Sequence, residues 1–265
     1  MIERRSIALA ITLAVLVAPT PHRAVAAPAQ ERAAREAFLR TAEIVGREVA
    51  DVGITLPERV ELEQGGVRRR AMFKSLDVTS SQKIRVGQEV QEGLRDSWTF
   101  EIAAYELDSL LGLGLVPIAV VRTIGDNEGA LIDWVDDALP EYGVSPEGFD
   151  MATWEDNVAT VWFFDYLVYN IDRTPENLLL LPGFRVKLID HSRAFQRFLV
   201  PMRPLMRFPR QAIDRLRALS DDEIRGPLSD YLTGEEIDAL LTRKRRILER
   251  VDELLATKPE GAVLF

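Results

Sequence analysis

Apolar positions in the first half of the chain predict a small sheet and two helices. Residues 29–50 place apolar side chains among charges at helical spacing, which predicts a leader helix. Residues 58–78 predict two strands around a Gly-Gly turn, and residues 118–124 and 130–135 predict two more around the turn sequence GDNEG. Residues 97–114 carry an apolar helical stripe, so this half is expected to be a sheet with one helix packed on it.

From Thr153 onward the pattern becomes mostly helical. Thr153 is expected to cap an apolar helix that runs through Tyr169. The short apolar runs NLLLL and RVKLID predict two strands joined by a Pro-Gly turn. Three more helices are predicted: 209–219, a segment capped by Ser220, and one from Thr233 to about Thr257.

Composition limits the possible classes of function. The chain has 265 residues, of which 47% are hydrophobic, enough for one large domain or two small lobes. Its net charge of -9 gives no electrostatic reason to expect a nucleic acid as a partner. The absence of cysteine excludes disulfides and thiolate chemistry.

The first 26 residues have the features of a secretory signal peptide. Arg4 and Arg5 precede a 12-residue apolar run at 7–18, and the small residues 24–26 are suitable for cleavage. The run is too short to cross a bilayer comfortably. We therefore expect an extracytoplasmic protein, periplasmic or secreted, without a stable membrane span after cleavage. The alternative is a protein anchored in the membrane by an uncleaved N-terminus.

Three polar residues of the helical half suggest phosphoryl-transfer chemistry. Asp172 follows the long apolar helix, and Asn177 lies five residues later. Asp190 ends the second short strand, and a hairpin there would bring Asn177 and Asp190 to the same edge. An amide and a carboxylate that converge in this way suit a hard cation such as Mg²⁺. Asp172 could orient an acceptor hydroxyl or take its proton.

A lysine and a glutamate of the first half could complete the site. Lys74 ends an apolar strand, where it is either a solvated strand-end residue or a clamp for phosphate groups. Glu101 is on the face of the following helix that must pack on this strand, so it could pair with Lys74.

The segments NIDRTPENLLL and VKLIDHS together resemble the catalytic and metal-binding loops of the protein-kinase-like fold. AMFK followed by FEIAAYELDSLLGLGLVP is similar to the small lobe of its atypical members. These are the phosphatidylinositol 3-/4-kinases, the HipA-type kinases and the secreted Golgi casein-kinase group. The resemblance covers roughly residues 55–255 and implies an α+β, two-lobed protein-kinase-like fold with a small β-rich N-lobe and a helical C-lobe.

The resemblance also implies roles for individual residues and two cofactors, ATP and Mg²⁺. Lys74 would contact the α- and β-phosphates of the nucleotide, and Glu101 would orient Lys74. Asp172 would be the catalytic acid/base. Asn177 and Asp190 would bind Mg²⁺. The acceptor would be a hydroxyl group of a protein or a small molecule.

Two further residues and the domain boundaries follow from the same resemblance. Trp134 and Val135, near the connector between the lobes, would lie against the adenine ring. The expected organisation is a signal peptide (1–26), a leader helix (27–52), an N-lobe (53–135), a connector (136–152) and a C-lobe (153–265).

Several residues depart from the pattern of regulated protein kinases. NID stands in place of the usual His-Arg-Asp, and Asp190-His191-Ser192 in place of Asp-Phe-Gly. Arg173 could contact a phosphate or form a salt bridge in the C-lobe, and His191 is expected to be a locally bonded turn residue. A pseudokinase that acts as a nucleotide- or protein-binding scaffold is therefore an alternative. Nucleotidyl transfer on the same fold is a third possibility.

Overall fold

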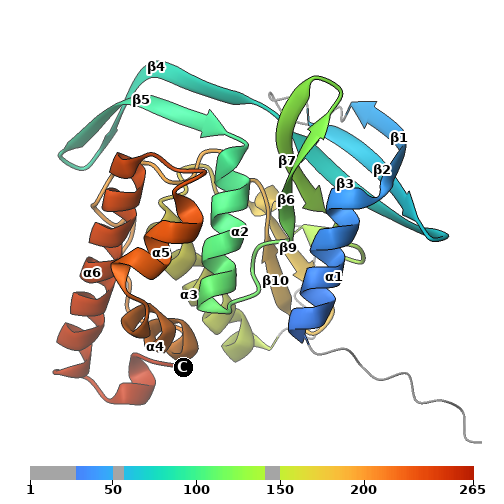
Figure 1. Ribbon diagram of the computed structural model, residues 1–265. Helices are drawn as coiled ribbons and strands as arrows, with labels where there is room; N and C mark the ends of the chain where they lie inside the picture. The colour runs from blue at the N-terminus through green and yellow to red at the C-terminus, as the bar shows by residue number, and fades with distance from the viewer. Residues whose placement is uncertain (1–27, 50–56, 141–149) are drawn as a thin grey trace, which may run out of the picture.

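The computed structural model of the chain describes residues 28–49, 57–140 and 150–265 (Figure 1). The smaller lobe is built on an antiparallel sheet with the strand order β1-β2-β3-β7-β6. All four strands predicted between residues 58 and 135 are present in this sheet. Its strands are β1 (Glu43–Val49), β2 (Glu58–Gln64), β3 (Val67–Lys74), β6 (Ala119–Ile124) and β7 (Asn127–Asp133).

Helices cover both faces of this sheet. Because side chains alternate along a strand, neighbouring residues of β3 point to opposite faces. Phe73 packs in one apolar cluster with Leu39 of α1 (Pro28–Thr41). Met72 instead packs against a second cluster, which includes the buried side chains of α2 (Thr99–Leu111). The N-lobe sheet therefore has α1 on one face and α2 on the face from which Lys74 extends.

The predicted leader helix is wrong over its second half. Helix α1 ends at Thr41, and the sequence EIVGREV forms strand β1. This strand pairs antiparallel with β2, from Glu43 opposite Glu63 to Val49 opposite Glu58. Pairing with β2 supplies hydrogen bonds that outweigh a weak local helical pattern.

A long hairpin between β3 and α2 was not predicted. It consists of β4 (Asp77–Val86) and β5 (Glu89–Ser97) and extends across the helical lobe (Figure 1). Near its tip, Oε2 of Glu89 accepts a hydrogen bond of 2.6 Å from the backbone N–H of Leu199. At its base, Arg95 forms a 3.1 Å ion pair with Glu236. The hairpin therefore ties the N-lobe to the C-lobe both near its tip and at its base.

The helical lobe largely follows the prediction. The long apolar helix begins one turn earlier than predicted, because Asp150 caps it and Thr153 donates its hydroxyl to Asp150. Ser220 and Thr233 each form a capping box, as expected from their positions before acidic residues. The elements are β8 (Leu139–Pro140), α3 (Met151–Val168), the 3₁₀ helix η2 (Pro175–Asn177), β9 (Leu178–Leu181), β10 (Arg185–Leu188), α4 (Arg210–Ala218), α5 (Asp221–Leu228), α6 (Gly234–Leu255) and η3 (Glu260–Ala262).

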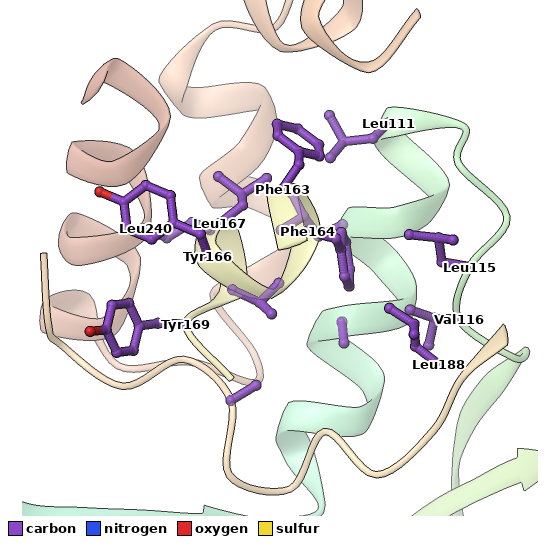
Figure 2. Close-up of a cluster of buried hydrophobic side chains, with 14 of the residues drawn as sticks. Leu111, Leu115, Val116, Phe163, Phe164, Tyr166, Leu167, Tyr169, Leu188 and Leu240 are labelled. Atoms are coloured by element: carbon purple, nitrogen blue, oxygen red, sulfur yellow. The ribbon is translucent and has the colours of Figure 1, made fainter. Parts of the chain in front are cut away.

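The core of the helical lobe surrounds α3. Figure 2 shows Phe163, Phe164 and Leu167 of this helix between Leu111 of α2 and Leu240 of α6. All five side chains are buried. The segment NIDRTPENLLL begins just after α3 ends, so this core fixes the start of that loop.

In the part of the chain that the structure describes, no helix combines the length and the apolar character needed to cross a membrane. The predicted signal peptide lies outside the described residues, as do residues 141–149 of the predicted connector. The location of the protein outside the cytoplasm therefore stays a prediction.

Candidate active site

Lys74, Glu101 and Asp190 meet between the lobes, although they lie at the end of β3, on α2 and after β10. Nζ of Lys74 donates to Oε1 of Glu101 at 2.6 Å and to Oδ1 of Asp190 at 2.7 Å. The side chains of Lys74 and Glu101 are 12% and 3% exposed, whereas that of Asp190 is 43% exposed. The predicted pairing of Lys74 with Glu101 is confirmed, and one ammonium group joins the two lobes.

Lys74 and Glu101 each favour the charged form of the other. Burial alone lowers the pKa of Lys74, but the carboxylates of Glu101 and Asp190 outweigh burial and hold that pKa above its ordinary value. Burial alone raises the pKa of Glu101, but the Lys74 ammonium and the contact with His191 outweigh it and hold that pKa well below its usual range. The lysine is therefore a fixed cation at a largely buried position between the lobes, where it can hold an anionic ligand strongly.

The backbone at Lys74 is fixed by a close approach of β3 and β7. Lys74 lies opposite Ala130 in the antiparallel register. At the neighbouring Gly129, a Cβ atom would collide with the carbonyl oxygen of Lys74 and with the ring of Phe73. Glycine at this position therefore lets the two strands pack closely where the lysine leaves the sheet.

Polar groups within the loop after α3 hold Asp172 and Asn177. The backbone N–H of Asp172 donates to Oδ1 of Asn170 at 3.0 Å, and Nδ2 of Asn177 donates to the carbonyl oxygen of Asp172 at 3.3 Å. The N–H of Ile189 donates to the carbonyl oxygen of Asn177 at 3.1 Å. Asn177 and Asp190 therefore lie at the same edge of the β9–β10 hairpin, as predicted.

Arg173 binds the two loops to α3. Its Nε lies 3.0 Å from Oδ2 of Asp165, and Nη1 donates at 2.8 Å to the carbonyl oxygens of both Asn177 and Ile189. Nη2 lies 3.2 Å from Nε2 of His191. Of the two roles left open for Arg173, the structure shows the salt bridge in the C-lobe. The residue after Asp172 thus braces a loop that lacks the usual His-Arg pair.

His191 connects this brace to Glu101. It is fully buried and packs edge-on against Phe164, with the ring centroids 6.1 Å apart. Its backbone N–H donates to Oε1 of Glu101 at 3.1 Å, and Nδ1 lies 3.6 Å from Oε2. Because Arg173 can only donate, Nε2 must accept, which places the ring proton on Nδ1, the nitrogen near Glu101. His191 is therefore more than the turn residue that was expected.

Arg193 lies between the catalytic loop and the end of β5. Its Nη1 is 3.3 Å from Oδ2 of Asp172, and its Nε is 3.1 Å from Oδ2 of Asp96. The side chains of Arg193 and Asp172 are both about half exposed. Neither Arg193 nor Asp96 was predicted to belong to the site, and the two residues are more than 90 positions apart in the chain.

The donor atoms at Asn177 and Asp190 suit a hard divalent cation. Since Nδ2 of Asn177 is used by the carbonyl oxygen of Asp172, its Oδ1 is left as an oxygen ligand. Oδ1 of Asp190 is held by Lys74 and by Ser192, at 3.4 Å, and among the described residues no hydrogen bond engages Oδ2. Within those same residues, no cluster of three or more acidic or histidine side chains forms an alternative metal site. Asn177 and Asp190 therefore fit the predicted role.

Trp134 follows β7 at the start of the lobe connector. Its backbone N–H donates to the carbonyl oxygen of Arg70 at 3.2 Å. Its ring lies near two guanidinium groups, 4.9 Å from that of Arg70 and 5.7 Å from that of Arg59. Val135 beside it is partly buried. The contact of Trp134 and Val135 with adenine stays a prediction.

Comparison with known proteins supports the same fold. No protein-family model matches the chain, and no curated protein matches its sequence. The structure of hydra Fam20 with sugar aligns with a TM-score of 0.67 and 20% identity over 91% of this chain and 93% of that one. The Golgi casein kinase with Mn and ADP bound aligns at 0.61 and 14%, over 90% and 79% of the two chains. The Helicobacter pylori proinflammatory kinase CtkA aligns at 0.52 and 11%, over 83% and 98%.

The chain therefore has a two-lobed, atypical protein-kinase-like fold. At these identities the likeness shows the fold alone.

Proposed function

We propose that this protein is an atypical kinase that transfers a phosphoryl group from ATP to a hydroxyl of a protein or a small molecule. The observation that carries the proposal is the cluster of Lys74, Glu101 and Asp190, drawn from both lobes at distances of 2.6 and 2.7 Å. A buried Lys-Glu pair beside an exposed carboxylate gives a cation for the donor's phosphates next to a ligand for a divalent metal.

The chain's own residues can divide the work of transfer. The acceptor oxygen forms a bond to the γ-phosphorus, the bond from this phosphorus to the bridging oxygen breaks, and ADP leaves with that electron pair. Asp172, at the accessible end of the loop, orients the acceptor hydroxyl and takes its proton. Lys74 holds the inner phosphates, and Glu101 prevents it from turning away.

Asn177 and Asp190 would hold Mg²⁺. The ion, when bound, would neutralise charge on the phosphoryl oxygens. The Golgi casein kinase of similar fold has Mn and ADP bound, which supports a nucleotide and a divalent metal as ligands of this fold. Lys74 would then exchange its contact with Asp190 for the phosphates while keeping Glu101.

Two kinds of hydroxyl group are candidate acceptors. One protein of similar fold is described as a casein kinase and another was solved with a sugar, so both protein and sugar hydroxyls are reasonable acceptors to test. If residues 1–26 direct export, the enzyme would act outside the cytoplasm, and it would need ATP or another donor from a host compartment or a released pool.

A nucleotide- or protein-binding scaffold is the second candidate. The altered residues of the two loops favour it, with NID in place of His-Arg-Asp and Asp190-His191-Ser192 in place of Asp-Phe-Gly. Nucleotidyl transfer, with ATP bound in the opposite direction, would use the same residues.

One assay separates these candidates. The mature protein, from about residue 28, is incubated with Mg²⁺ and γ-labelled ATP, and label transfer and phosphate release are followed. We expect Asp190→Ala to lower the rate by about 10²-fold or more, the scale of removing a key electrostatic group. Asp126→Ala, at the exposed β6–β7 turn, should have no effect. Stabilisation by Mg-ATP without turnover would support the scaffold, and labelling only from α-labelled ATP would support nucleotidyl transfer.

A further inference from the structure

A small cavity lies on the flank of the catalytic loop, beside the segment that follows the Asp190 turn. Its volume is about 140 Å³. That is well below the roughly 300 Å³ or more of a site for a whole drug-sized ligand, so it admits a single chemical group. The walls come from α3, from the loop and from the segment before α4: Trp162, Asp165, Tyr166, Asn170, Ile171, Arg173, Met202 and Arg203.

Asn170, one of the residues that line this cavity, has an unused hydrogen-bond donor. The residue is 1% exposed, and its Oδ1 accepts from the backbone N–H of Asp172, which fixes which end of the amide is oxygen. Its buried Nδ2 has no hydrogen-bond partner in the described part of the chain. Buried amide groups are rarely left unpaired, because they lose their bonds to water without replacement. A ligand oxygen in the cavity would remove this deficit.

The charge of the lining favours an anion. Asp165 is neutralised by Arg173, whose Nε and Nη2 both donate to it. Arg203 lies with its guanidinium 4.2 Å from the ring centroid of Trp162, and no carboxylate pairs with it among the residues that the structure describes. The positive charge of Arg203 is therefore uncompensated, and the guanidinium is held at the cavity wall by its contact with the indole ring of Trp162.

We infer that this cavity is a binding site for a compact anionic group, a carboxylate or a phosphate, received by Nδ2 of Asn170 and the guanidinium of Arg203. The apolar walls of Trp162, Ile171 and Met202 would contact the carbon atoms that carry the group. The side chain of Asp172 faces Arg193 and does not line this cavity. The anion site is thus beside the proposed reaction centre and separate from the proposed metal ligands.

The site can be tested without any assay of activity. The side-chain amide of Asn170 gives its own signal in ¹⁵N-labelled full-length protein, which Asn170→Asp would assign, since aspartate keeps the acceptor for Asp172 and removes the donor. Sodium phosphate and sodium acetate are titrated at constant ionic strength. We expect a saturable shift of this signal, and at least about tenfold weaker binding in Arg203→Gln, the scale of one hydrogen bond to a charged group.

Arg246→Gln is the matched control. Arg246 is another arginine of this surface, but it donates to the carbonyl oxygen of Leu199 and does not line the cavity. Its variant should bind as the wild type does, and the backbone amide spectrum of each variant shows whether it is folded. A signal that does not saturate, or equal binding in Arg203→Gln and wild type, would overturn the site.

Kinetic measurements distinguish two sources of the anionic group, an acceptor molecule or a free anion. Of the tests of this site, only this one rests on the proposed function. If the group is part of the acceptor, inorganic phosphate should raise the KM for the acceptor and leave the KM for ATP unchanged. If both KM values stay constant while the amide signal shifts, the ligand is a free anion. If the wild type shows no turnover, the proposed function fails, and the titration still decides whether the site exists.

Discussion

Two charged networks flank the cleft, and they differ mainly in burial. The inner network consists of Lys74, Glu101, His191, Arg173 and Asp165, and each of these side chains is at most 14% exposed. The outer network consists of Asp172, Arg193 and Asp96, and two of its three side chains are nearly half exposed. The inner one runs from the sheet through α2 to α3, whereas the outer one joins the catalytic loop to the hairpin.

This difference indicates a division of labour. A buried pair that loses one partner leaves an uncompensated charge, so the inner network holds its geometry tightly. Exposed pairs contribute little and can open without great cost. We therefore interpret the inner network as the frame that sets the positions of Lys74 and the loops. Under the proposed function, the outer network would open when an acceptor reaches Asp172.

The largest expected effect is on stability, from Arg173→Met. The variant leaves Asp165 buried without its partner, and it should lower the free energy of unfolding by about 3–5 kcal/mol. Arg193→Met is the matched change in the outer network, and it should cost about 1 kcal/mol or less. Urea denaturation of both variants measures the contrast. Equal losses would remove the distinction between the two networks.

Next in size is the effect of Lys74→Met on phosphoryl transfer. The variant keeps the length of the side chain but removes the cation from the donor's phosphates, so we expect a loss of about 10²–10³-fold in rate. Lys83→Met, on the exposed hairpin strand β4, is the control and should keep full activity. A Lys74→Met variant that retained most of the rate would contradict the role given to the inner network.

The same variant should change the dependence of stability on pH. Lys74 holds the pKa of Glu101 below its ordinary value of 4.5. As the pH falls, Glu101 is therefore protonated in the unfolded chain before it is protonated in the folded protein. Glu101 therefore stabilises the wild type above about pH 4.5, and this contribution falls as the pH falls below that value. In Lys74→Met, burial raises the pKa of Glu101 above its ordinary value. The ionised Glu101 then destabilises the folded variant, and this loss disappears as the pH falls. The gap in unfolding free energy between the two proteins should narrow from pH 6 to about pH 3; a constant gap would argue against the coupling.

The smallest effect is expected from Arg193→Gln. Because its contacts with Asp172 and Asp96 are exposed, the rate should change by no more than about fivefold, the equivalent of about 1 kcal/mol. Any change should appear in the KM for the acceptor and diminish at high salt. Steady-state kinetics at two salt concentrations test this. A loss as large as that of Lys74→Met would place Arg193 with the catalytic groups.

The sequence was most informative where chemistry and periodicity coincide. Asp172 follows an apolar helix, and Asn177 and Asp190 stand at the ends of two short apolar strands, so their positions could be predicted from spacing. Lys74 and Glu101 could be paired because a strand and the helix packed on it must share a face.

Other features depend on contacts between distant segments. Strand β4 is mostly exposed, and the residues that β5 buries are Gln91, Leu94 and Ser97, so the hairpin carries no alternation of apolar residues that would reveal its strands. Strand β1 looks helical by itself and is a strand only because β2 lies beside it. The ion pair between Arg173 and Asp165 did leave a signal in the sequence. Asp165 is a lone carboxylate in the apolar run WFFDYLVYN, two turns before Arg173, and a buried carboxylate needs a partner.

The most direct test of the central claim is a crystal structure of the mature protein with Mn²⁺ and ADP. The anomalous signal of manganese locates the metal without reference to any assay. The proposed function predicts a peak about 2.0–2.6 Å from a carboxylate oxygen of Asp190 and from Oδ1 of Asn177, with Lys74 turned to the phosphates and still paired with Glu101. A metal bound elsewhere, or a cleft that keeps the Lys74–Asp190 pair and takes up no nucleotide, would contradict it.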